Sequence, residues 1–433
     1  MIDRRTPPPL QPIRNINLPA WETTRFANGV TAHVVDGGTQ DVIKVEMIFP
    51  AGRWHEPTRG VAAAVAAQLK EGTRTKTALE VANLVDFYGA SISTHAYIDY
   101  ASVSLYTLTK HLQALLPLMR ELLSESVFPQ HELAIFKSNS IQKLSINEQK
   151  VEFRAQRLFT EVLYGKQHPI GYTTSKEDFE ALQTGMLVTH RNNTYDPHDC
   201  IMIVSGKVKG DAFKLIEQYL GTDNWSNPQR ADSVHEPVTT NGTRVHNEPI
   251  DGAVQSALRV GKRFINKLHP DYPAVKCANL VLGEYFGSRL MSNLREDKGY
   301  CYGIHSSIAS FLHDGYLLIA SEVGADVTDG ALKEINTELE RLQQDLVPAD
   351  ELDAARNYRL GTLLGDLDGP FSSADLLKGL LLFGLGKDYF NRYVETVQTI
   401  TPQQIRDAAQ QYFHPDSMIT AVAGSAVREA QTV

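Results

Sequence analysis

The sequence has few cysteines and no long apolar run, and both absences exclude whole classes of protein. Only Cys200, Cys277 and Cys301 occur in 433 residues, without a CxxC pair, so neither a disulfide framework nor a cysteine metal site is predicted. No stretch reaches the roughly 18 apolar residues of a membrane-spanning helix. The first residues include two arginines with no apolar segment after them. We therefore expect a cytoplasmic protein, or a periplasmic one if a secretory signal was removed.

Basic residues are in the minority. Lysine and arginine number 42 against 51 aspartates and glutamates, which gives a formal net charge of −9. This balance argues against nucleic acid or an anionic membrane as the main partner. The sequence also lacks a phosphate-binding P-loop, a G-x-S-x-G elbow and a dinucleotide fingerprint. With 42% apolar residues, the chain is long enough to bury more than one core, so we expect two to four domains.

Two landmarks recur at nearly the same interval. The segment around Pro129, Phe-Pro-Gln-His-Glu-Leu, returns around Pro348 as Val-Pro-Ala-Asp-Glu-Leu, and the segment Tyr-Asp-Pro-His-Asp around Pro197 returns around Pro415. Two landmarks in one register indicate an internal duplication. We predict an N-terminal domain at 18–220, a linker at 221–244 that is rich in Pro, Asn, Thr and Gly, and a homologous C-terminal domain at 245–426.

Strand and helix signals alternate in both halves. Thr77-x-x-Glu80 and Thr401-x-x-Gln404 are capping boxes that open helices, whereas Pro117 should kink or shorten the helix predicted near residues 112–123. Helices that cover antiparallel sheets, repeated twice, predict an α+β class. The predicted strands are 28–35, 42–50, two within 91–107, 200–204, 254–260, 302–310 and 315–322, and the other predicted helices are 130–164, 273–282 and 329–342.

The most informative segment is 60–73, which reads GVAAAVAAQLKEGT. Its framing resembles the pitrilysin and mitochondrial processing peptidase family, whose active members place His-x-x-Glu-His between small leading residues and a trailing Gly-Thr. Those three positions are Ala63, Ala66 and Ala67 here. Residues spaced i, i+3 and i+4 share one helix face, where two imidazoles bind zinc and a carboxylate activates water. Alanine can do neither, so this motif is degenerate.

The resemblance also locates the family's third zinc ligand, a glutamate on a later helix. Counting from Glu132-Leu133 brings that position near Gln142 and Lys143, and neither is a metal-binding carboxylate. We therefore predict that this chain binds no metal and that 60–73 is a packed, alanine-rich helix.

A second segment, LGEYFGSRLMSNLREDKGYCYGIHSSI from Leu282, resembles the family signature that ends in an arginine and a tyrosine seven residues later. Arg295 and Tyr302 occupy these positions. The resemblance implies that they contact the substrate backbone or transition state in the site of a zinc-bearing partner, whereas Arg289 and Glu296 hold the local structure. The alternative interpretation is a charged helix end followed by a tyrosine packed inside the domain.

Other candidates carry weaker signals. His95 lies where the family has an edge strand that pairs with substrate, and an exposed strand residue is the simpler interpretation. No histidines are spaced i, i+4, and His305 and His313 flank a predicted turn, so we expect no metal there. The proline-rich segment 6–12 is interpreted as an extended arm, with docking onto a partner as the alternative.

The resemblance implies two tandem homologous domains that form one half of a clamshell. We expect the non-catalytic, substrate-binding subunit of a heterodimeric zinc peptidase, with a homologous HxxEH-bearing partner that holds the zinc and with unfolded or short peptides as substrates. A structural or chaperone-like pseudopeptidase subunit, like the core proteins of respiratory complexes, is the alternative. An independent homodimeric peptidase conflicts with the missing ligands.

Overall fold

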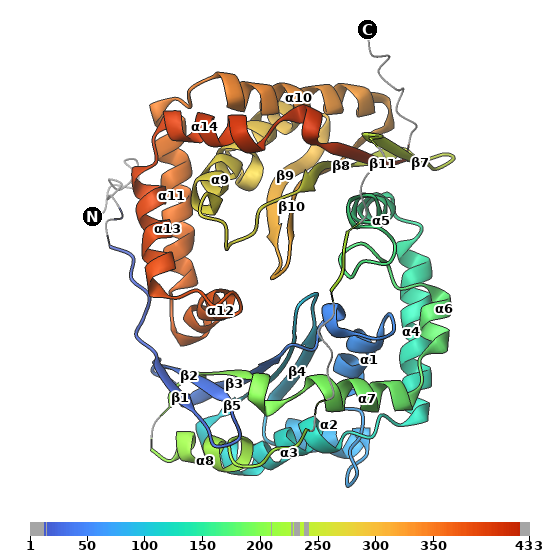
Figure 1. Ribbon diagram of the computed structural model, residues 1–433, viewed down its shortest axis with the longest axis vertical. Helices are drawn as coiled ribbons and strands as arrows, with labels where there is room; N and C mark the ends of the chain where they lie inside the picture. The colour runs from blue at the N-terminus through green and yellow to red at the C-terminus, as the bar shows by residue number, and fades with distance from the viewer. Residues whose placement is uncertain are drawn as a thin grey trace, which may run out of the picture.

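The computed structural model describes residues 13, 15–208, 210–226, 228, 234–237 and 242–424. The proline-rich segment 6–12 and much of the predicted linker lie outside these ranges. Within them, no helix combines the length and the apolar character needed to cross a bilayer. The chain forms two halves that face each other, with residues before the linker in the lower half of Figure 1 and residues after it in the upper half.

Each half is built around one sheet. The first sheet has the order β1-β2-β6-β3-β5-β4 and the second the order β7-β11-β8-β10-β9. One pair in each is parallel, β2 with β6 and β7 with β11, and the other pairs are antiparallel. This repeated arrangement confirms the predicted α+β class. The strands are β1 Glu22–Arg25, β2 Thr31–Asp36, β3 Val42–Phe49, β4 Ser91–Ala96, β5 Ala101–Leu108, β6 Ile201–Gly206, β7 Val245–Pro249, β8 Gln255–Arg263, β9 Cys301–Ser310, β10 Gly315–Gly324 and β11 Ile419–Gly424.

The helices recur in the same order in both halves. The predicted landmarks fall at equivalent places, because Pro129 and Pro348 are the N-caps of the long helices α4 and α11. Thr77 and Thr401 form the two predicted capping boxes. The helices are α1 Val61–Gln68, α2 Ala78–Phe87, α3 Leu112–Glu125, α4 Gln130–Asn147, α5 Val151–Tyr164, α6 Lys176–Ala181, α7 Thr184–Thr194, α8 Ala212–Leu220, α9 Tyr272–Asn279, α10 Thr328–Gln344, α11 Ala349–Asp366, α12 Pro370–Leu381, α13 Lys387–Thr399 and α14 Pro402–Tyr412.

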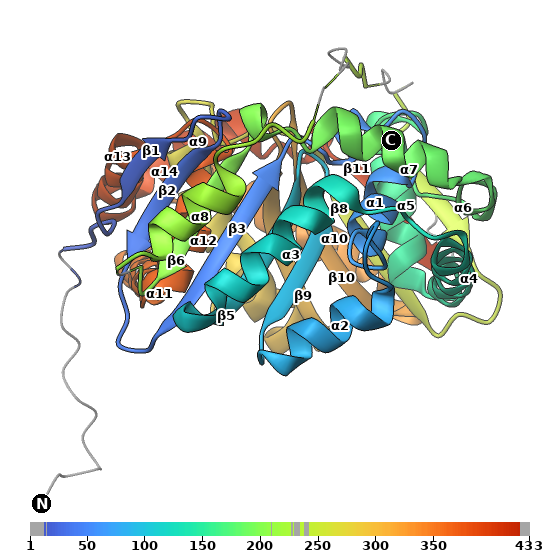
Figure 2. The same cartoon turned by 90° about the horizontal axis from the view of Figure 1, so that it is seen from below.

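Each sheet has an outer face that is covered by helices of its own half. Figure 2 shows α2, α3 and α8 crossing the outer face of the first sheet. Helices α9, α10 and α14 cover the outer face of the second sheet (Figure 1). The two largest apolar cores of the described chain lie between these helices and their sheets. In each sheet the strand side chains alternate between the two faces, so every second residue points toward the covering helices and contributes to the core.

On the inner faces, the two halves exchange a helix. Phe159 and Leu163 of α5, from the first half, pack with Leu318 of β10 in the second half. In return, Leu377 of α12, from the second half, packs with Ile203 of β6 in the first half. Figure 1 shows α5 beside the second sheet and α12 beside the first. The halves are therefore joined by apolar packing in both directions.

A buried charge network strengthens the contact of α12 with the first sheet. Glu46 on β3 is only 4% exposed. Its carboxylate lies 3.0 Å from Nζ of Lys378 on α12 and 2.9 Å from Nζ of Lys44. Asp375 accepts from both lysines, at 3.0 and 3.2 Å. Two cations and two anions thus balance each other at the boundary between the halves.

The hairpin tips of the two sheets form a further contact. Oδ2 of Asp99, between β4 and β5, accepts a hydrogen bond of 3.1 Å from the amide of Leu312, between β9 and β10. Burial raises the pKa of Asp99 to about 6, although this hydrogen bond partly opposes the shift. His313 stacks on Trp54 with ring centroids 4.2 Å apart. These contacts bring the tips together at the centre of the molecule (Figure 1).

Some predicted elements were wrong in detail. The single helix expected over 130–164 is two helices, because the chain turns at 148–150 and α5 leaves to pack on the second sheet. Pro117 lies inside α3 on the exposed side of that helix and does not shorten it, since the helix continues to Glu125. The edge strands β1 and β7 were not predicted.

Candidate functional site

Helix α1 contains the degenerate motif, and a half-buried carboxylate caps its start. Gly60 precedes the helix with φ +83°, a left-handed conformation that glycine adopts without strain. Glu56 accepts hydrogen bonds from the amides of Gly60 and Ala62, at 3.2 and 2.9 Å. Burial raises the pKa of Glu56 to about 7, while these two amides and Arg53 act in the opposite direction. A cap that binds two free amides stabilises the helix end.

The three alanines of the motif lie on the side of α1 that faces away from the core cluster of Val61 and Val65. Ala63 is exposed, Ala67 is half-buried and Ala66 is buried. Methyl groups have no lone pair, so these positions do not fit a zinc ion. Gln142 and Lys143 lie exposed on α4 and offer an amide and a cation instead of a carboxylate.

No group of three or more His, Cys, Asp or Glu side chains in the described part of the chain has an arrangement suited to a metal. This agrees with the side chains at the motif. The described residues therefore offer no alternative set of ligands that would replace the missing ones.

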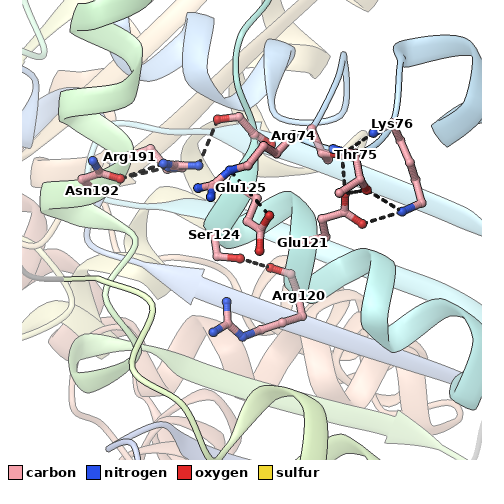
Figure 3. A network of polar contacts seen from close by, with 11 residues as sticks. Arg74, Thr75, Lys76, Arg120, Glu121, Ser124, Glu125, Arg191 and Asn192 are labelled. Carbon is pink, nitrogen blue, oxygen red and sulfur yellow. Dashed lines mark hydrogen bonds and ion pairs between the residues drawn. The ribbon is translucent and has the colours of Figure 1, made fainter.

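The segment that follows α1 is held by a polar network on α3. Figure 3 shows Glu121 of α3 pointing toward Thr75 and Lys76. Its carboxylate accepts from the hydroxyls of Thr73 and Thr75 and from Nζ of Lys76, the last at 2.6 Å. Burial alone would raise the pKa of Glu121, but these three donors lower it to about 2. The fold thus keeps the Gly72-Thr73 end of the motif in place although the ligands are absent.

Arg295 and Tyr302 lie at the start of the second sheet's edge strand. Arg295 belongs to a π-helical turn, Met291–Asp297, and its guanidinium lies 4.4 Å above the ring of Phe286. Tyr302 is the second residue of β9 and is 95% exposed. Among the described residues, neither side chain has a hydrogen-bond or ion-pair partner. The interpretation of Tyr302 as a tyrosine packed inside the domain is therefore wrong.

The two side chains remain available to a ligand. The Arg295 charge acts on the neighbouring Cys301: burial raises the pKa of that thiol, and Arg295 is among the groups that oppose this shift. A phenol and a guanidinium can both donate hydrogen bonds to a carbonyl oxygen or an oxyanion. The alanines belong to α1 in the first half of the chain, whereas Arg295 and Tyr302 belong to the second half.

Arg289 has the structural role that was predicted for it. It is 5% exposed and forms a two-pronged ion pair with Glu351 of α11, with N–O distances of 2.7 and 3.1 Å. Such a pair fixes the turn before Met291 to a long helix. Glu296, predicted to do the same, is exposed and has no polar partner within the described ranges.

The candidate histidines do not come together. His95 lies exposed on the edge strand β4, as the simpler interpretation predicted. His313 is in a turn and stacks on Trp54, whereas His305 lies within β9 and does not flank the turn. Burial lowers the pKa of both His305 and His313.

Comparisons with known proteins agree with this geometry. Residues 182–358 match the family model described as the peptidase M16 inactive domain. The uncharacterized zinc protease YmxG of Bacillus subtilis is 22% identical over 406 residues, which cover 92% of this chain and 97% of that protein.

Two solved structures share the fold. A peptidase M16 inactive domain from Pseudomonas fluorescens is 22% identical with a TM-score of 0.85, and the match covers 95% of this chain and 99% of that one. The periplasmic protease PqqL from Escherichia coli is 16% identical with a TM-score of 0.77. That match covers 98% of this chain but only 49% of PqqL, so this chain corresponds to one half of the longer protease.

Proposed function

We propose that this chain, which matches the peptidase M16 inactive domain over residues 182–358 and is similar to the zinc protease YmxG over most of its length, is the non-catalytic, substrate-binding subunit of a two-chain peptidase. The observation that carries the proposal is the set of methyl groups at Ala63, Ala66 and Ala67 within a fold that is otherwise complete. The capping carboxylate of Glu56 and the network at Glu121 keep this region ordered. A chain that keeps the architecture but not the ligands needs the metal of another chain.

The length of the chain supports a paired arrangement. This chain matches 49% of PqqL, whose single polypeptide is long enough to hold two such units. A second, homologous subunit that carries HxxEH and the third glutamate would supply the other unit and the zinc. The pair would enclose an unfolded or short peptide, which would add as a strand to the sheet edge of the zinc subunit.

This chain's contribution would come from Arg295 and Tyr302. Neither side chain has a polar partner among the described residues, and Tyr302 is almost fully exposed. When the two subunits close, the phenol would donate to the scissile carbonyl oxygen as negative charge develops there. The guanidinium would hold a neighbouring peptide carbonyl. Both groups act by positioning and by charge stabilisation, and neither needs a metal of its own.

The test is reconstitution with a zinc-bearing homologue from the same genome. We expect the isolated chain to contain no stoichiometric zinc and to cleave no peptide, and we expect a mixture with the homologue to cleave an unfolded fluorogenic peptide. The control is a homologue whose HxxEH glutamate is replaced by glutamine, which should assemble with this chain but not cleave.

Two outcomes would contradict the proposal. Zinc-dependent cleavage by the isolated chain would show that it holds its own metal. Stable assembly with the homologue that leaves cleavage unchanged, together with suppression of partner aggregation, would favour the structural or chaperone-like alternative.

A further inference from the structure

We propose that a cavity in the second half binds the carboxylate of an organic acid that also has an apolar body. The cavity has a volume of about 420 Å³ and lies between α9, α11, α12 and α13, beside β9. These helices gather on one side of the molecule in Figure 1. The inference does not depend on the proposed peptidase role, because it rests on the side chains of this cavity alone.

The walls of the cavity combine apolar and aromatic surface with charged side chains. Ile308, Leu380 and Phe390 contribute aliphatic and aromatic surface, and the rings of Tyr272 and Tyr389 also line the space. Binding sites for small organic molecules are typically apolar hollows of this size with a few convergent polar groups. The walls therefore fit a ligand with an apolar body.

Three cations converge on the same cavity, namely Lys267, Lys276 and Arg359. Lys276 is already paired, because its Nζ lies 2.8 Å from Glu284. Arg359 uses one donor, Nε, in a bond of 2.7 Å to the hydroxyl of Tyr393. Its other guanidinium donors have no partner in the described part of the chain.

Lys267 is the decisive group. It is half-buried, and its Nζ has no carboxylate or hydrogen-bond acceptor among the described residues; its recorded contact is with the ring of Phe383, 5.1 Å away. Burial, and then the charges of Lys276 and Arg359, lower its pKa. An ammonium that is removed from water without a partner is unfavourable. A bound carboxylate would relieve this by accepting from Lys267 with one oxygen and from Arg359 with the other.

The remaining carboxylates do not fill this role. Asp375 is held by Lys44 and Lys378 at the boundary between the halves, and Glu284 is held by Lys276. Asp366 is exposed on α11. Lys267 and the free donors of Arg359 therefore have no hydrogen-bonded carboxylate among the described residues, although Glu284 and Asp366 act on Arg359 through their charges.

The internal duplication relates two of the helices around this cavity to helices of the first half. Helices α9 and α11 are the counterparts of α1 and α4, the two helices that would carry metal ligands in an active first half. In the second half, α9 contributes Lys276 and α11 contributes Arg359 to the lining of the cavity. The positive charges of Lys276 and Arg359 repel a metal cation and attract an anion. This cavity therefore favours an anion, whereas an active first half would bind a metal.

The experiment is calorimetric titration of the full chain with three probes. These are 3-phenylpropionate, the tripeptide Ala-Leu-Phe with a free carboxylate, and the same tripeptide with a C-terminal amide. We expect the first two to bind and the amide to bind at least tenfold more weakly. Tighter binding of the free tripeptide than of 3-phenylpropionate would identify a peptide C-terminus as the ligand, and the reverse order would identify a free acid.

Two variants test the residues. Lys267→Met should weaken binding of both carboxylates by roughly tenfold to a hundredfold, the usual effect of removing a charged hydrogen bond. Lys262→Met is the matched control, because Lys262 is also half-buried beside an aromatic ring, 5.7 Å from that of Phe264, but lies outside the cavity. It should bind as the parent chain does.

Gly379→Leu fills the cavity without removing charge. The nearest atom to a Cβ built at Gly379 is Nζ of Lys267, at 3.8 Å, so a larger side chain there enters open space. This variant should abolish binding while the melting temperature stays the same or rises. Equal binding of the amide, unchanged affinity in Lys267→Met, or no binding of any probe to the parent chain would each overturn the proposal.

Discussion

Replacing Tyr302 by phenylalanine removes one hydroxyl from a side chain that is 95% exposed and has no hydrogen-bond partner among the described residues. The free chain loses no contact, so its free energy of unfolding should change by less than about 0.5 kcal/mol. In the paired enzyme the hydroxyl would face a developing oxyanion. Removal of one such donor typically raises the barrier by about 2.7–4 kcal/mol, so we expect kcat to fall by roughly 10²–10³.

The ring and the hydroxyl can be separated by a second variant. Tyr302→Ala removes the whole ring, and if the partner subunit covers that ring, assembly should weaken by about 1.5–3 kcal/mol in addition to the loss in kcat. Tyr358→Phe is the matched control, because Tyr358 is also exposed, at 46%, but lies on α11 and not on β9. The assay is steady-state cleavage of an unfolded peptide by the reconstituted pair, with the dissociation constant of the subunits measured separately.

Two results would contradict the role of Tyr302. If Tyr302→Phe assembles normally and keeps the parent kcat and KM, the hydroxyl takes no part in the reaction. If Tyr302→Ala also assembles with the parent affinity, the ring lies outside the interface. Tyr302 would then lack the role that its position in the family signature implies.

Further predictions concern the stability of the chain. Glu46→Gln should lower the free energy of unfolding in chemical denaturation by about 1.5–3 kcal/mol, because it removes the charged partner on β3 from the half-buried Lys378 and Lys44. Adding Lys378→Met should restore part of the loss, and a loss below about 0.5 kcal/mol would argue against the network. Glu121 has a folded pKa of about 2, below its unfolded value near 4.3, so its stabilisation should be complete above about pH 4.3 and disappear as the pH falls toward 2. Glu121→Gln should therefore be less stable than the parent chain at pH 7 and differ little from it near pH 2, and an equal difference at both pH values would contradict this. A protease recognition sequence can be inserted after Pro228 so that the chain is cut between its two halves. The cut chain should still elute as one species in gel filtration, because α5 and α12 each pack on the sheet of the other half. Separate elution of the two fragments would disprove this exchange of helices.

Local signals in the sequence predicted much of the fold. The capping boxes of Thr77 and Thr401 each join residues that are three positions apart, so they can be predicted from the sequence alone. The duplication was also visible, because Pro129 and Pro348 each begin a long helix at the same point of the repeat. The boundaries proposed for the domains and the linker stay a prediction.

Contacts between distant residues explain what could not be predicted. The break between α4 and α5 follows from the packing of Phe159 on a strand of the other half, about 160 residues away in the chain, and no local signal marks it. Glu46 and Lys378 are even further apart in the chain, by 332 residues, although a glutamate inside the apolar strand 42–49 was a signal that a partner was required. The candidate site also has features that the sequence shows and features that only the structure shows. The loss of ligands at Ala63 is visible in the sequence, whereas the exposure of Tyr302 and the convergence of Lys267 with Arg359 appear only in three dimensions.

The crossing of α5 and α12 determines where motion can occur. To move apart, the two sheets would have to strip apolar side chains from both helices and break the ion pairs of Glu46, all within one polypeptide. In the proposed two-chain peptidase, opening and closing around a substrate would therefore take place between the two subunits, with each turning as a solid body about their shared boundary.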